Sequence, residues 1–98
     1  MRIYRSNLDK AMDTINTLLK TPLTAYNKPT VGERYVANIG NWHLDAANGG
    51  YTASVMNNES GGTTNPLSCG YLPAKELFAM LCGVVVGIEA AIKANGQT

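Results

Sequence analysis

The chain has 98 residues, enough for one domain, and 45% of them are hydrophobic, which excludes a charge-rich disordered protein. Eight Lys and Arg against seven Asp and Glu give a net charge of +1 without any block of like charge. This balance argues against a broad basic surface for nucleic-acid polymers. The first residues contain no apolar signal-peptide core, so we expect the protein to stay in the cytoplasm.

The first predicted element is a helix that starts with the S-x-x-D pair Ser6 and Asp9. Apolar residues recur at helical spacing behind this pair, and we expect them to pack in the core. They are Leu8, Ala11, Met12, Ile15, Leu18 and Leu19. Pro22 predicts that the helix ends near Lys20–Thr21.

Strands follow the helix. Residues 21–32 contain two prolines and a glycine and read as an irregular connection, and residues 33–39 alternate like a strand. Residues 41–46 and 51–56 then read as the two strands of a hairpin. The sequence therefore predicts three consecutive strands, which we expect to form an antiparallel sheet.

The hairpin register is limited by its turn. If Asn48–Gly49 forms a type I′ turn, Trp42 faces Val55, one face of the hairpin is apolar and the other, with His43, is polar. A turn at Gly49–Gly50 shifts every pair by two and keeps the same faces. The sequence therefore defines which residues share a face and leaves both registers open.

Residues 66–72 predict a short fourth strand, and residues 73–96 predict the strongest helix of the chain. Pro73 suits the first helical position and Asn95–Gly96 a helix end. The fold class we predict is α+β. Residues 1–98 form a single domain, a small antiparallel sheet of three to four strands with an N-terminal and a C-terminal helix packed on it.

The last helix is apolar nearly all round, so it needs cover on two sides. Its apolar run from Leu77 to Ile92 is shorter than the ~20 residues that span a bilayer, and Glu89 interrupts it, so we expect no membrane partner. The helix either lies buried on the sheet or uses its Gly83-x-x-x-Gly87 side to contact a second copy. We favour the second copy.

Catalytic and metal signals are few. His43, Asp45 and Ser54 share one hairpin face, so a small hydrolase is one hypothesis. No oxyanion hole or strained nucleophile turn accompanies them. The sequence has no metal-ligand spacing and no phosphate-loop or dinucleotide motif. We therefore predict a non-enzymatic protein without a metal or cofactor. Cys69 and Cys82 lie in unlike settings, and we expect two free thiols rather than one disulfide.

The loop at 57–64, NNESGGTT, combines amides, hydroxyls and two glycines. Its backbone N–H groups are able to point outward as an anion-binding nest, with a simple solvent loop as the alternative. Arginines and polar-tipped aromatics would add phosphate pairing and base stacking. The candidate ligand-binding residues are Arg5, Arg34, Tyr35, His43, Asn57, Asn58, Ser60, Gly61, Gly62 and Thr63.

The order of a short N-terminal helix, GNWHLDAANGGYTASVMNNESGG and LPAKELFAMLCGVVVGIEAAI resembles the Thoeris anti-defence sponges. These small phage proteins bind cyclic nucleotide signals of bacterial immunity without cleaving them. The resemblance covers residues 6–94 and rests on length and element order. It implies a homo-oligomer built from dimers, up to a hexamer, in the infected bacterial host. It also implies ligand pockets at subunit interfaces, where aromatic rings stack on adenine and arginines hold phosphates.

One departure from the family concerns charge, since no arginine follows Arg34. A phosphate clamp would have to draw on Arg2, Arg5, Arg34 or Lys75, from one subunit or several. The alternative function is an interaction protein that inhibits a host factor directly through the apolar last helix.

Overall fold

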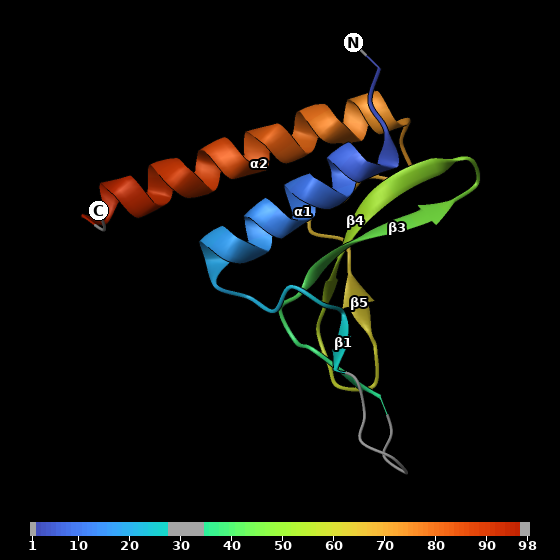
Figure 1. The fold of residues 1–98 in the computed structure, drawn as a ribbon, viewed down its shortest axis with the longest axis horizontal. Helices are drawn as coiled ribbons and strands as arrows, with labels where there is room; N and C mark the ends of the chain where they lie inside the picture. Colours follow the sequence, from blue (N-terminus) through green and yellow to red (C-terminus); the bar gives the residue numbers. More distant parts are fainter. Residues whose placement is uncertain (1, 28–34, 97–98) are drawn as a thin grey trace.

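The computed structural model describes residues 2–27 and 35–96. It has an α+β fold, as predicted (Figure 1). The elements are α1 (Arg5–Leu19), β1 (Tyr26–Asn27), β2 (Val36–Ala37), β3 (Trp42–Ala47), β4 (Gly50–Met56), β5 (Thr63–Thr64) and α2 (Ala74–Ala94). Strands β3, β4 and β5 form a three-stranded antiparallel sheet in that order, and β1 pairs with β2 in a two-stranded sheet.

The β3–β4 hairpin confirms the predicted faces and chooses between the two registers. Trp42 pairs with Val55, and every other pair follows from a two-residue turn at Asn48–Gly49. Asn48 has a φ of 53° and Gly49 a φ of 76°, as a type I′ turn requires at both central positions. The turn matches the right-handed twist of the strands, which explains why this register holds.

Helix α1 begins earlier than predicted. The backbone N–H of Tyr4 donates to Oδ1 of Asn7 at 2.8 Å, so Asn7 completes the start of the helix. The predicted pair at residues 6–9 lies inside α1. The predicted end is confirmed, because Lys20 adopts the left-handed conformation with a φ of 59° directly before Thr21 and Pro22.

The first two strands differ from the predicted single strand at 33–39. Only Val36–Ala37 is a strand, and residues 33 and 34 lie outside the described residues. Its partner, Tyr26–Asn27, falls within the connection that was predicted to be irregular. A pair of two-residue strands has too few residues to show an alternating pattern, so periodicity could not reveal β1.

The predicted fourth strand at 66–72 is misplaced. The strand that joins β4 is β5, and Thr63 and Thr64 pair with Met56 and Val55. Within the predicted segment, Leu72 forms only an isolated bridge with Tyr51. Thr63 and Thr64 are β-branched, which suits an edge strand. Pro66, in the predicted segment, has no N–H to donate to a neighbouring strand.

The core lies where the two helices meet the hairpin. Helix α1 contacts both α2 and β3, and α2 contacts β4 near its N-terminal end. The buried side chains of this cluster are Leu8, Met12, Ile15, Ala53, Leu77 and Leu81. All three residues from α1 belong to the predicted apolar stripe, so the periodicity argument is confirmed for that helix.

A buried polar junction connects the end of α1 to the start of β3. Asn16 is fully buried, and its amide accepts from the N–H of Trp42 and donates to the carbonyl of Trp42, each at 2.8 Å. Beside it, Nδ2 of the buried Asn41 donates to the carbonyl of Pro22 at 2.7 Å. These side chains give hydrogen-bond partners to part-buried backbone groups at the junction. Neither asparagine was predicted from the sequence to have this role.

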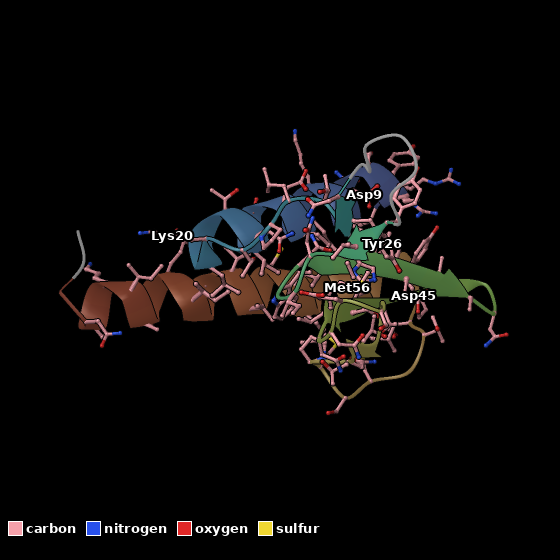
Figure 2. All side chains as sticks on the ribbon, turned by 90° about the horizontal axis from the view of Figure 1, so that it is seen from below. Asp9, Lys20, Tyr26, Asp45 and Met56 are labelled. Carbon is pink, nitrogen blue, oxygen red and sulfur yellow. The ribbon has the colours of Figure 1, made fainter. Side chains whose placement is uncertain are left out.

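One alternative for α2 was a helix buried on the sheet. In the structure, most of α2 is exposed. Leu77 and Leu81 are buried, but the C-terminal half extends past both the sheet and the end of α1 near Lys20 (Figures 1 and 2). Val86 is 66% exposed. In the most apolar 18-residue stretch of α2, only 11% of the residues are buried. The second side that the sequence requires to be covered is open in the single chain.

Helix α2 also passes a length and composition test for a membrane span. It has 21 residues, which is longer than the apolar run from Leu77 to Ile92, and the most apolar 18-residue stretch within it is strongly hydrophobic. The buried core helix of a soluble protein can pass the same test. The expectation of no membrane partner therefore remains a prediction.

Candidate functional site

The loop between β4 and β5 is held by its own asparagine. The N–H of Asn57 donates to the carbonyl of Gly62 at 2.8 Å, which closes the loop. Oδ1 of Asn58 accepts from the N–H of Ser60 at 3.0 Å and from the N–H of Gly62 at 2.9 Å. These N–H groups point into the loop rather than outward as predicted. Asn58 therefore takes the place that an anion would occupy in a nest.

The same loop is attached to the β1–β2 sheet. The N–H of Ala37 donates to the carbonyl of Glu59 at 3.1 Å. Gly61 has a φ of 96°, and a Cβ at this position would lie 2.7 Å from the hydroxyl of Tyr26. Glycine is thus favoured at position 61 by its backbone conformation and by the close ring. The loop is a fixed part of the fold rather than a free solvent turn.

A cavity of about 400 Å³ opens where this loop meets β2. In the described part of the chain, its lining consists of Tyr35, Val36, Glu59 and Ser60. Tyr35 is 66% exposed, and its ring stands at 89° to the ring of Tyr26, with centroids 6.5 Å apart. Of the predicted site residues, Tyr35 and Ser60 are thus brought together. Glu59 joins them without having been predicted.

Four other predicted residues, Asn57, Asn58, Gly61 and Gly62, belong to the same loop, whereas Arg5 and Thr63 do not line the cavity. Arg5 is exposed and sits 3.9 Å from the Asp9 carboxylate within α1, whose start is at the opposite end of the molecule from the β4–β5 loop (Figure 1). Thr63 lies in β5 and is exposed. Arg34 lies outside the described residues. The predicted set is therefore not one site, and its assembled part is the cavity beside Tyr35.

His43 and Asp45 share a strand face but bind different partners. Nδ1 of His43 lies 3.2 Å from Oδ1 of Asn41. Because the amide of Asn41 already donates to Pro22, its oxygen is the acceptor and the imidazole is the donor. Asp45 accepts a hydrogen bond from the Tyr71 hydroxyl at 2.9 Å. The carboxylate that a triad needs beside the imidazole is thus engaged with a tyrosine.

The Tyr71–Asp45 contact changes the acidity of the phenol. The hydrogen bond to the Asp45 carboxylate raises the pKa of Tyr71 above its usual value, and desolvation and the negative charge act in the same direction. Tyr71 is nevertheless 40% exposed, so water screens the pair.

The polar face of the hairpin is partly covered by the chain that follows β5. Thr52 and Ser54 are buried, and Nδ2 of Asn65 donates to Oγ1 of Thr52 at 3.0 Å. Sγ of Cys69 lies 3.6 Å from the same hydroxyl. Cys69 is partly buried and Cys82 exposed, and both thiols are free, as predicted.

Comparisons with protein-family models, with curated proteins and with solved structures found no match for this chain.

Proposed function

We propose that this chain binds a small nucleotide-like molecule without cleaving it, and thereby sequesters a cyclic nucleotide signal of bacterial immunity in the infected host. The observation that carries the proposal is the cavity beside Tyr35, whose volume of about 400 Å³ suits a small ligand. The geometry supports binding of a ring with polar substituents. The resemblance supplies the identity of the ligand as a cyclic nucleotide.

The lining suits the base and the sugar of such a ligand. Tyr35 meets the ring of Tyr26 edge to face and is largely exposed, so we expect a base to stack on its ring. The Ser60 hydroxyl and the Glu59 carboxylate are placed to bond ribose hydroxyls or an exocyclic amine. The charge of Glu59 repels phosphate, so the phosphates face away from it. Arg34, next to Tyr35 in the sequence, stays the predicted phosphate ligand.

Thermal denaturation with a ligand panel tests the proposal. The panel contains cyclic ADP-ribose isomers, cyclic di- and trinucleotides, and adenosine as a probe without phosphate. At 100 times its Kd, a ligand stabilises the folded state by about 2.7 kcal/mol, which raises the Tm of a domain of this size by about 10–20 °C. No shift with any member at saturating concentration would contradict the proposal.

A substitution at Tyr35 identifies the site. Tyr35→Ala removes the stacking ring and should weaken binding of the active ligand by about 5- to 150-fold, from a stacking energy of ~1–3 kcal/mol. Tyr4→Ala is the matched control, because Tyr4 is 58% exposed but lies directly before α1, at the other end of the molecule. Titration calorimetry measures both. Equal affinities for the two variants would place the ligand elsewhere.

A second candidate function is direct inhibition of a host factor, and the open apolar face of α2 favours it. Such a protein would hold a stoichiometric host protein and no small molecule. The test is reconstitution with a purified candidate partner. Val86→Asp, which puts a charge on the exposed face, should abolish that complex, while circular dichroism should show that the free chain keeps its helices.

A further inference from the structure

The open face of α2 follows a strict seven-residue repeat. Positions that alternate by three and four residues lie on one side of a helix and form the contact line of a coiled coil. On α2 these positions are all exposed. We refer to them as the α2 seam: Glu76, Ala79, Gly83, Val86, Ala90 and Lys93. The seam is apolar and small in the middle and charged at both ends.

None of the described residues approaches the middle of the seam. A Cβ built on Gly83 would meet no atom within 4 Å, and the same holds at Gly87. An apolar groove of about 430 Å³ runs alongside, between α1 and α2, and Phe78, Val85 and Val86 contribute to its lining. Contiguous exposed apolar surface of this kind marks an interaction site.

The charges of the seam determine what fits it. Glu76 lies in the first turn of α2 and Lys93 in the last. A second α2 that runs antiparallel brings Glu76 of each copy against Lys93 of the other, twice by two-fold symmetry. A parallel helix in the same register would instead bring like charges together at both ends.

The residues between the charges agree with the same register. When two α2 seams pack antiparallel, each seam residue in one half of a helix faces a seam residue in the other half of the partner helix. The layers are Glu76–Lys93, Ala79–Ala90 and Gly83–Val86. The largest apolar side chain of the seam thus meets a glycine, and the remaining apolar layer contains alanine only. Small side chains let two helices approach closely, which gives the glycines of α2 a packing role.

We propose that the α2 seam is a self-association surface, on which a second copy of this chain packs with its α2 antiparallel. The pair has two-fold symmetry and is closed, so this surface yields a dimer. It involves none of the residues that line the cavity beside Tyr35. Failure of the dimer and failure of ligand binding are therefore separate results.

Gly83→Leu tests the close approach. The position is helical and open among the described residues, and leucine favours helices over glycine, so the variant should fold. Its circular dichroism should show the helical content of the unchanged chain. In the dimer the added side chain occupies the place of the partner's Val86. We expect the unchanged chain to sediment as a dimer at micromolar concentrations and Gly83→Leu as a monomer. A monomeric unchanged chain at 100 µM, or an unimpaired Gly83→Leu dimer, overturns the proposal.

A charge exchange tests the orientation of the helices. Glu76→Lys and Lys93→Glu alone each turn two attractive pairs into repulsive ones and should weaken the dimer about tenfold. The double variant Glu76→Lys/Lys93→Glu restores both pairs and should restore the dimerisation constant. Weakening without rescue overturns the antiparallel register. Flotation of the unchanged chain with phosphatidylcholine vesicles, unaffected by Gly83→Leu, would assign the seam to a bilayer and overturn the proposal as well.

Discussion

At the scale of single residues, the least expected feature is that asparagine does much of the positioning. Asn16 holds the start of β3 against α1, Asn41 holds the chain before it, and Asn58 organises the loop. Each uses a short, planar amide that donates and accepts at once. A sequence pattern shows only that these residues are polar. Their partners lie in other segments, so the sequence could not identify these roles.

Asn16→Ala should lower the free energy of unfolding by about 2–4 kcal/mol. The change leaves the part-buried N–H and carbonyl of Trp42 without their Asn16 partner, and each unpaired group costs ~1–3 kcal/mol. Urea denaturation measures the loss. Thr14→Ala is the control, because Thr14 is exposed on the same helix and bonds only a carbonyl within it. If Asn16→Ala lowers the free energy of unfolding no more than Thr14→Ala does, the hydrogen bonds of Asn16 do not stabilise the junction as described.

Tyr71 adds a pH dependence to the stability. Because Asp45 raises the pKa of Tyr71 in the folded state, the contact stabilises the fold below the unfolded pKa of about 10. The contribution disappears as the pH rises through the folded pKa. Tyr71→Phe should therefore be slightly less stable than the unchanged chain at pH 7, and the difference should vanish at high pH. Urea titrations between pH 7 and pH 11 check this, and a constant difference would refute it.

At the scale of elements, the parts predicted best are those defined by neighbours in the sequence. The hairpin follows from alternation and an Asn-Gly turn, and both helices follow from apolar spacing. The short strands β1 and β5 could not be predicted, because two residues carry no period. For the site, the sequence selected Tyr35 and Ser60 but also Arg5. Only the folded arrangement separates them.

The conformation of the β3–β4 turn can be tested directly by substitution of Gly49. Gly49→Ala places a side chain on a residue with a φ of 76° and should cost about 1–2 kcal/mol of unfolding free energy. Gly70→Ala is the control, because Gly70 is open and has no left-handed conformation. Thermal denaturation of both variants measures the loss, which should be larger for Gly49→Ala than for Gly70→Ala. Equal stabilities would mean that the turn is not of type I′ in solution.

At the scale of the whole molecule, the single chain is broad and thin. Its extents are 43 × 40 × 22 Å, and its radius of gyration is 14.4 Å, against about 13 Å for a compact domain of 100 residues. The excess comes from α2, which reaches past the sheet on one side, and from the small β1–β2 sheet on another (Figure 1). A chain of this length buries only a modest core by itself. The proposed second copy on the α2 seam would add the buried surface that the single chain lacks.

The asparagine junction fixes the base of one segment, and the length of that segment can vary while the helices and the hairpin stay unchanged. Asn16 and Asn41 tie the chain on either side of the segment that runs from Pro22 to the start of β3, so that segment forms a loop closed at its base. Each doubling of the length of a closed loop costs only ~0.6 kcal/mol. Insertions there should leave the helices and the hairpin intact while they reshape the surroundings of Tyr35. The architecture thus allows the part of the molecule around Tyr35 to diversify while the helices and the hairpin stay unchanged.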